Sequence, residues 1–136
     1  MSELPGTHSH RIQIYYEDTD HSGAVYHANY LKYFERAREH MLGVPELVRL
    51  LRVDGVGFVV YRVELTFRQP ARFGDSLEIR STVSPESDYR LVFRQDAFKD
   101  GRLLVSAVIQ LACVDSANEI APIPASVVAR VVSDRT

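Results

Sequence analysis

Two carboxylates and two histidines lie close together near the start of this chain, on either side of a glycine: Asp18, Asp20, His21 and His27 around Gly23. A pattern typical of a helix follows directly, so these ionisable groups are expected near unpaired backbone N–H groups and the positive end of a helix dipole. Such a setting suits acid–base chemistry that passes through an anionic transition state. No other part of the sequence offers as many chemically active side chains.

The two aspartates differ in their sequence surroundings. Aspartate ahead of a helix ordinarily caps the helix or a turn, and we favour that interpretation for Asp18. Asp20 is followed three residues later by Gly23, which lets the backbone come close to a ligand while the chain turns into the helix. We therefore expect Asp20 to serve function.

Either neighbouring histidine, His21 or His27, could donate a proton, bind a metal or hydrogen-bond a neighbour. His27 lies at the expected helix start, beside backbone donors that would polarise a carbonyl, which favours a functional role. A metal site built from the aspartates and histidines is less favoured, because they show no recognised ligand spacing. The remaining histidines, His8, His10 and His40, are expected to lie on the solvated surface.

Length, charge and cysteine content narrow the class of protein. The 136 residues fit one domain, and the formal net charge of -2 argues against a general nucleic-acid binder. The single cysteine, Cys113, lies in an apolar run, which suits a reducing compartment. Residues 1–10 lack the pattern of a secretory signal, and no apolar run reaches the ~20 residues of a membrane-spanning helix. We expect one cytoplasmic domain, with residues 1–9 as a flexible N-terminal tail.

Apolar periodicity predicts the elements that position these groups. Alternation predicts a strand over residues 11–16, helical spacing predicts a long helix from about Tyr26 to Gly43, and Pro45 opens a shorter helix. Four strands are expected next, at residues 59–67, 77–83, 89–98 and 103–114, with a tight hairpin at 99–102. Residues 125–132 are expected to form a last short helix or strand. The predicted class is α+β, in which an antiparallel sheet of about five strands packs around essentially one central helix.

The segment from Tyr15 to Arg38 resembles the hotdog-fold acyl-CoA thioesterases of the YbgC and 4-hydroxybenzoyl-CoA thioesterase group. The resemblance rests on Tyr15-Tyr16-Glu17-Asp18-Thr19-Asp20, on Gly23-Ala24-Val25-Tyr26-His27-Ala28-Asn29-Tyr30 and on Phe34-Glu35-Arg36-Ala37-Arg38. It extends in weaker form over nearly the whole chain except its two ends. It implies a hotdog fold and a homodimer or homotetramer whose active sites lie at the subunit interface.

The resemblance also implies roles for individual residues. Asp20 is similar to the family's catalytic carboxylate, acting as nucleophile or as general base on water, and His27 is similar to its assisting histidine. Tyr16 is similar to a tyrosine near the site in the YbgC-like branch. The oxyanion contact would come from the backbone N–H groups of Val25, Tyr26 and His27.

Two further positions are implicated in substrate binding, Gly23 and Glu35. Glu35 is included because a different hotdog branch uses a helix glutamate as its catalytic carboxylate. The chain also departs from the family, since His21 and Ser22 follow Asp20 where members often have small residues. His21 therefore competes with His27 for the assisting role.

The implied activity is hydrolysis of an acyl-CoA thioester to a free acid and coenzyme A, with no metal or organic cofactor. Acyl carrier protein is an alternative partner to coenzyme A. Two other hypotheses stay open: a hotdog hydratase or dehydratase acting on acyl thioesters, and a non-catalytic module that binds an acyl thioester or acyl carrier protein. The D-x-D-x-x-G-x-V-Y-H run favours hydrolysis over hydration.

Overall fold

The computed structural model describes residues 6–135 and contains one five-stranded antiparallel sheet with the strand order β1-β3-β4-β5-β2. The strands are β1 (His8–Gln13), β2 (Gly57–Phe67), β3 (Ser76–Pro85), β4 (Arg90–Lys99) and β5 (Arg102–Val114). The four strands expected after the helices are confirmed to within a few residues. The tight hairpin between β4 and β5 is confirmed as well, with Asp100 and Gly101 both at positive φ.

The helices end near the residues that the sequence signals indicated, but the long helix begins at Asn29, three residues after the expected start at Tyr26, so His27 precedes it. Helix α1 (Asn29–Leu42) ends at Gly43, whose φ of +99° favours glycine. Helix α2 (Val44–Arg49) follows and continues as a π-helical turn, η2 (Leu50–Asp54). Residues 125–132 were expected to form a helix or a strand and belong to helix α3 (Ala125–Arg135). No helix in the described part of the chain is long and apolar enough to span a bilayer.

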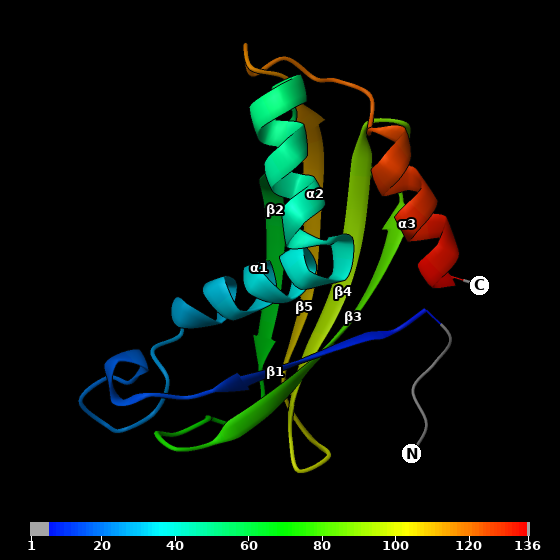
Figure 1. The fold of residues 1–136 in the computed structure, drawn as a ribbon. Helices are drawn as coiled ribbons and strands as arrows, with labels where there is room; N and C mark the ends of the chain where they lie inside the picture. The colour runs from blue at the N-terminus through cyan, green and yellow to red at the C-terminus, as the bar shows by residue number, and fades with distance from the viewer. Residues whose placement is uncertain (1–5, 136) are drawn as a thin grey trace.

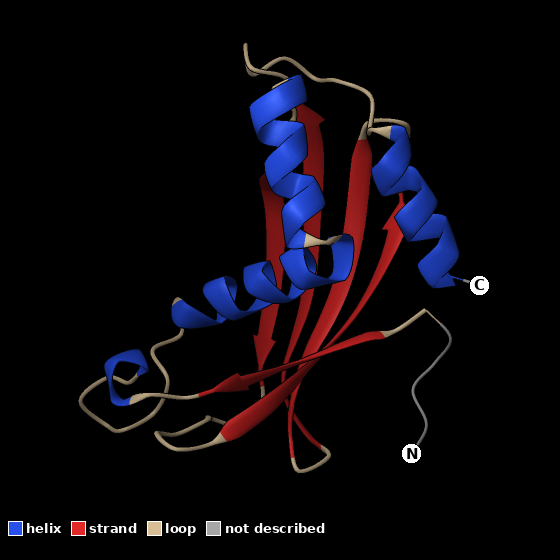
Figure 2. Cartoon of the chain, in the orientation of Figure 1, coloured by secondary structure: helices blue, strands red, loops and turns tan. Residues whose placement is uncertain are grey.

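The helices lie on one face of the sheet, and α1 runs across the strands (Figures 1 and 2). Side chains at helical spacing on α1 are fully buried against the inward-facing positions of the strands, among them Phe34, Ala37 and Met41. Helix α3 also covers this face, since Val127 and Val131 are each 1% exposed. The prediction that the sheet packs against the long helix is confirmed, but α3 packs against the same face of the sheet.

The N-terminal strand differs from its prediction. It begins at His8 and ends at Gln13, because its backbone pairs with β3 only over that length. Tyr16 was expected in the strand and instead lies in a short 3-10 helix, η1 (Tyr16–Asp18). The expected flexible tail of residues 1–9 is wrong at His8 and Ser9, which belong to β1; residues 1–5 lie outside the described range.

Strand β2 forms one edge of the sheet and pairs only with β5 among the described strands. Its apolar side chains are unusually exposed for a strand, at 39–49% of their surface: Val59, Val60, Tyr61, Val63 and Phe67. An edge with free backbone groups and exposed apolar side chains favours pairing with another chain.

Candidate active site

A tight loop, residues 19–25, connects η1 to the segment before α1, and we call it the Asp20 loop. Its two ends pair as an antiparallel bridge between Thr19 and Val25. The Asp20 N–H donates to the Ala24 carbonyl at 2.9 Å, and the Gly23 N–H donates to the Asp20 carbonyl at 3.0 Å. Gly23 has a φ of +82°, a conformation that side chains with a Cβ rarely adopt. The glycine therefore shapes the loop that presents the aspartate.

The carboxylate of Asp20 is exposed and is held by Ser22. Oδ1 of Asp20 accepts hydrogen bonds from the Ser22 hydroxyl at 2.5 Å and from the Ser22 backbone N–H at 2.8 Å. These two bonds, led by the hydroxyl, lower the pKa of Asp20, because they stabilise the charged form. Asp20 is thus ionised at neutral pH, as a base or nucleophile must be. The role of Ser22 was not predicted from the sequence, although an aspartate that accepts from the backbone N–H two residues on is a recognised turn pattern.

Asp18 caps the preceding turn, as expected. Its Oδ2 accepts a hydrogen bond from the Tyr15 N–H at 2.8 Å, which closes η1. Its backbone carbonyl accepts two more, from the Asn29 side-chain amide at 2.8 Å and from the Tyr26 N–H at 2.9 Å. Asp18 therefore ties the Asp20 loop to the first residue of α1.

His27 lies just before α1, with its ring centroid 4.5 Å from that of Tyr26 and 6.4 Å from that of Phe67. It lines a small cavity of about 250 Å³ together with Val25, Tyr30, Phe67, Arg68, Gln69 and Pro70. Among the described residues, no hydrogen bond or ion pair joins His27 to Asp20. The two side chains share a segment of chain but make no direct contact of that kind.

His21 and Tyr16, which the sequence also implicated, have exposed side chains, the first in the Asp20 loop and the second in η1 before it. His21 is exposed, and its charge makes a minor contribution to the lowered pKa of Asp20. Tyr16 is 76% exposed and packs edge-on against Phe73, with ring centroids 5.7 Å apart. Within one protomer, neither side chain is therefore buried against the carboxylate of Asp20.

Two of the three backbone amides expected to form the oxyanion contact donate to carbonyls within the chain. The Val25 N–H donates to the Ala71 carbonyl at 2.8 Å, and the Tyr26 N–H donates to the Asp18 carbonyl at 2.9 Å. These amides are occupied, because the Asp20 loop is tied to neighbouring chain through them. Within the described residues, the amides of His27 and Ala28 have no such acceptor, and Ala28 caps α1 without a side-chain hydrogen bond. The backbone N–H groups that are left to bind an oxyanion ahead of α1 are therefore those of His27 and Ala28.

A larger cavity of about 580 Å³, which we call the apolar pocket, lies between α1, α2 and β2. Most of its lining is apolar, with Glu35, Arg38 and Glu39 as the charged exceptions; the apolar lining is Leu42, Val44, Leu47, Val48, Leu51, Val56, Gly57, Phe58, Val59, Val60, Phe93 and Leu111. Glu35 therefore lines this pocket and is absent from the lining of the small cavity beside His27. A pocket of this size and polarity suits a hydrocarbon group.

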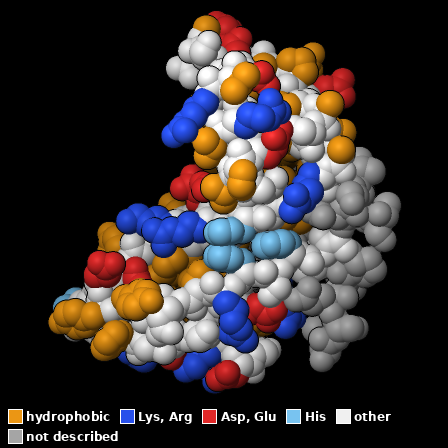
Figure 3. All heavy atoms as spheres, in the orientation of Figure 1, with side chains coloured by type: hydrophobic (Ala, Val, Ile, Leu, Met, Phe, Trp, Pro, Cys, Tyr) orange, Lys and Arg blue, Asp and Glu red, His pale blue; other side chains and the backbone are white. Residues whose placement is uncertain are grey.

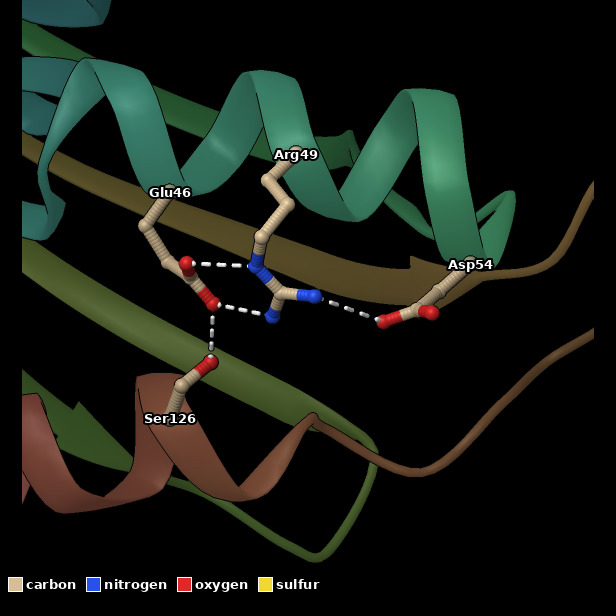
Figure 4. Close-up of polar contacts among 4 residues, drawn as sticks. All are labelled: Glu46, Arg49, Asp54 and Ser126. Carbon is tan, nitrogen blue, oxygen red and sulfur yellow. Dashed lines mark hydrogen bonds and ion pairs between the residues drawn. The ribbon is translucent and has the colours of Figure 1, made fainter.

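Polar contacts fix the α2 wall of the apolar pocket (Figure 4). Glu46 accepts hydrogen bonds from Arg49 at 2.6 and 2.8 Å and from the Ser126 hydroxyl at 2.6 Å. Arg49 also lies 3.6 Å from Asp54, at the end of η2. The bonds from Arg49 and then Ser126 lower the pKa of Glu46 to about 2. This network joins α2 to α3 and to the turn that follows α2.

A cluster of histidines lies where β1 meets α1, and Figure 3 shows histidine side chains gathered on that face. The rings of His10 and His40 stack, with centroids 4.6 Å apart and planes 17° from parallel. Partial burial, followed by the charges of His40 and His8, lowers the pKa of His10. The expectation that these histidines are merely solvated is therefore wrong for His10, because the strand pairing of β1 places it against α1.

The donors needed for a metal centre are not brought together in the described part of the chain. No group of three or more His, Cys, Asp or Glu side chains is placed there to hold a metal ion. Metal-independent chemistry stays a prediction, to be tested by chelation.

Comparison with known proteins places this architecture in a family. The model of the thioesterase-like superfamily matches residues 15–131. The acyl-CoA thioester hydrolase YbgC of Escherichia coli is 38% identical over 106 residues, which cover 76% of this chain and 79% of that protein.

Solved structures share the same fold. A probable thioesterase from Bartonella henselae superposes with a TM-score of 0.82 at 31% identity, covering 87% of this chain and 99% of that one. A 1,4-dihydroxy-2-naphthoyl-CoA thioesterase from Synechocystis superposes with a TM-score of 0.85 at 24% identity, covering 93% and 96% of the two chains. The chain therefore belongs to the thioesterase-like superfamily and has the hotdog fold of its thioester hydrolases.

Proposed function

We propose that this protein hydrolyses acyl-CoA thioesters to a free acid and coenzyme A, and that Asp20 is its catalytic carboxylate. The observation that carries the proposal is the placement of Asp20: an exposed, ionised carboxylate on a glycine-shaped loop that leads into the open N-terminus of α1. The similarity to the acyl-CoA thioester hydrolase YbgC supports coenzyme A as the carrier.

The proposed chemistry uses the carboxylate and the helix terminus together. As a general base, Asp20 takes a proton from water while the water oxygen attacks the thioester carbonyl carbon. The carbonyl oxygen becomes an oxyanion, which the amides of His27 and Ala28 and the dipole of α1 stabilise. Collapse of the tetrahedral intermediate breaks the C–S bond and releases the coenzyme A thiolate, which takes up a proton. In the nucleophilic alternative, the Asp20 carboxylate attacks the carbonyl carbon and expels the coenzyme A thiolate, and water then hydrolyses the resulting mixed anhydride to the free acid and the regenerated carboxylate.

We assign the assisting role to His27 in preference to His21. The ring of His27 lines the small cavity at the start of α1, next to the amides proposed for the oxyanion. An imidazole there can donate a proton to the departing thiolate. Both histidines are exposed, but His21 lines neither cavity described above. Tyr16 is assigned to the margin of the site, where it packs on Phe73.

We further propose that two protomers build each active site. In one protomer the small cavity beside His27 is lined by Phe67, at one end of β2. The apolar pocket is lined by residues 57–60, at the other end of the same strand. Val60 and Phe67 are about 23 Å apart along an extended strand, so one acyl thioester does not easily join the two cavities within a chain.

Antiparallel pairing of β2 with its own copy resolves this separation. A two-fold axis near Arg62 would bring the Phe67 end of one strand beside residues 57–60 of the partner. The Asp20 loop of one protomer would then face the apolar pocket of the other. The exposed apolar side chains of β2 would be buried in the same step.

A thiol-release assay over short, long and aromatic acyl-CoAs tests the activity. We expect release of free thiol by the wild type, and a loss of at least about 100-fold in kcat for Asp20→Asn with the fold retained. EDTA treatment should leave turnover unchanged, because backbone donors and not a cation stabilise the oxyanion. Substrate bound without thiol release would favour a binding module. Conversion of a 3-hydroxyacyl-CoA to its enoyl-CoA with loss of water, without thiol release, would favour a hydratase or dehydratase.

A further inference from the structure

The two backbone N–H groups proposed to bind the oxyanion belong to the central residues of a β-turn, His27 and Ala28. The Asn29 N–H donates to the Tyr26 carbonyl at 2.9 Å, and this bond between the fourth and first residues closes the turn. His27 and Ala28 are both exposed, and Asn29 is the first residue of α1. The direction of the two amides is therefore set by the ends of the turn, Tyr26 and Asn29.

Both ends of this turn are tied to one atom, the carbonyl oxygen of Asp18. The Tyr26 N–H donates to that oxygen at 2.9 Å, and Nδ2 of Asn29 donates to it at 2.8 Å. A carbonyl oxygen has two lone pairs, so these two donors use its capacity in full. Asp18 lies two residues before Asp20. One atom thus connects the turn to the loop that carries the proposed catalytic carboxylate.

Asn29 does not act as a helix cap. A capping side chain belongs to the residue before the helix and accepts hydrogen bonds from the amides of the first turn. In this chain that residue is Ala28, which makes no side-chain capping bond. Asn29 follows it, and its side-chain amide donates to the chain that precedes the helix. The Asn29 side chain is therefore a donor directed at Asp18, and it leaves the amides of His27 and Ala28 open.

The Asp20 loop has other support besides Asn29. The bridge between Thr19 and Val25 closes the loop, and the Val25 N–H donates to the carbonyl of Ala71 at 2.8 Å. Ala71 is fully buried, so this second attachment is fixed to the core. Removal of the Asn29 side chain would leave both contacts in place. Its amide therefore affects where the turn lies relative to the loop more than whether the loop forms.

We propose that Asn29 is a positioning residue that holds the amides of His27 and Ala28 in the place relative to Asp20 that the reaction requires. This inference rests on the proposed thioesterase function and adds a residue that acts through the backbone without touching substrate. Negative charge develops on the thioester oxygen as water attacks, so the amides must face that oxygen beforehand. A displacement of about 1 Å is enough to cost about 100-fold in rate.

Asn29→Ala tests the role by thiol release from one acyl-CoA. We expect kcat to fall between about 10- and 100-fold with KM nearly unchanged, because the amides are displaced while the contacts to the acyl group and coenzyme A stay. The dissociation constant of S-hexyl-CoA, a thioether without a carbonyl oxygen, should also stay nearly unchanged. The acidic limb of the pH–rate profile should not move, because the bonds that hold the Asp20 carboxylate come from Ser22.

Infrared spectroscopy measures the oxyanion contact directly. Benzoyl-CoA with an isotopic label at its thioester carbonyl is bound to Asp20→Asn, in which hydrolysis is slow. Amide donors polarise the C=O bond and lower its stretching frequency relative to that of the free thioester. We expect a smaller shift in the double variant that combines Asp20→Asn with Asn29→Ala. A side chain that only stabilised the fold would leave this shift unchanged.

Two further variants separate position from stability. Asn29→Asp keeps the size of the side chain and places a carboxylate in the first turn of α1, where the helix dipole favours it. This variant should fold, but its side chain does not donate to the Asp18 carbonyl, so kcat should fall. Gln13→Ala is the matched control, because Nε2 of Gln13 also donates to a backbone carbonyl, that of Ile14 at 3.3 Å, and kcat should stay. Urea midpoints and light scattering report fold and assembly.

The outcomes separate this inference from the proposed function. Absence of thiol release from every acyl-CoA with the wild type would contradict both. An active wild type beside an Asn29→Ala or Asn29→Asp variant with wild-type kcat would overturn the role of Asn29 and leave the thioesterase proposal intact. An unchanged carbonyl frequency in the double variant, or an equal loss of kcat in Gln13→Ala, would overturn that role as well.

Discussion

Ser22 directs both its hydroxyl and its backbone N–H at the same oxygen of Asp20, at 2.5 and 2.8 Å. The pair is local in sequence, and it sets the ionisation of the residue proposed to carry the chemistry. The hydroxyl makes the larger contribution to lowering the pKa of Asp20. The two bonds also orient the carboxylate, because they hold Oδ1 against Ser22 in the loop.

Ser22→Ala should shift the acidic limb of the pH–rate profile to higher pH. Loss of the hydroxyl donor raises the pKa of Asp20, so a smaller fraction of the carboxylate is ionised at any acidic pH. Activity well above that pKa should change little. The measurement is kcat/KM against pH, with Ser87→Ala as control, since Ser87 holds a turn elsewhere by accepting from the Tyr89 N–H. An unchanged acidic limb would contradict the role of Ser22.

Asp18→Ala should lower stability more than it lowers turnover. Asp18 accepts the hydrogen bond that closes η1, and loss of a capping side chain costs about 1 kcal/mol of unfolding free energy. Urea denaturation measures this loss, and thiol release measures the remaining kcat. Glu17→Ala is the control within the same short helix. If Asp18→Ala abolished kcat while the unfolding free energy stayed constant, the two aspartates would have to exchange roles.

His27→Ala should lower kcat by about 100-fold, the usual effect of removing a positioned acid–base group. His21→Ala should lower it much less, because His21 lines neither cavity described above, whereas His27 lines the small one. Steady-state kinetics of the two variants on one acyl-CoA provide the comparison. An inactive His21→Ala beside an active His27→Ala would reverse the assignment of the assisting histidine.

Val63→Lys should break the proposed assembly and abolish activity together. Val63 is 39% exposed on the edge strand β2, where a copy of the same strand would bring two lysines close to each other. Light scattering should show at least a dimer for the wild type and a monomer for the variant. Val128→Lys, at a valine of 44% exposure on α3, is the matched control. A fully active monomer would contradict the shared active site.

Stability should fall as the pH drops below about 6.5, the usual pKa of histidine. Burial and the neighbouring histidines lower the pKa of His10 in the folded state, so the unfolded chain binds more protons between the folded pKa and that value. Above it, His10 is neutral in both states and contributes no pH dependence.

Urea midpoints at pH 7.5 and pH 5.5 measure this effect. His40→Gln removes the stacked partner of His10 and should reduce the difference between the two midpoints. His21→Gln, at an exposed histidine outside the cluster, should not reduce it. Equal pH dependence in the wild type and in His40→Gln would show that the stack does not disfavour protonation.

The sequence by itself determined the element types, the approximate ends of the helices and strands, and the capping role of Asp18. These features depend on local causes: apolar periodicity, a glycine that ends α1, and a carboxylate three residues from the N–H that it accepts from. It also singled out Asp20 and His27, because the density of ionisable groups before a helix is visible without knowledge of the fold.

Contacts between segments that are distant in sequence could be identified only from the tertiary structure. The Val25 amide is occupied by Ala71, and Arg38 meets Gln95 across 57 residues of sequence. Neither pairing can be inferred from periodicity, because each depends on which strands are neighbours and in what register. The same holds for the edge position of β2, which follows from the strand order and decides where a second copy would bind. Local pattern fixes what each segment becomes, whereas the order of the sheet decides which groups are left free to act.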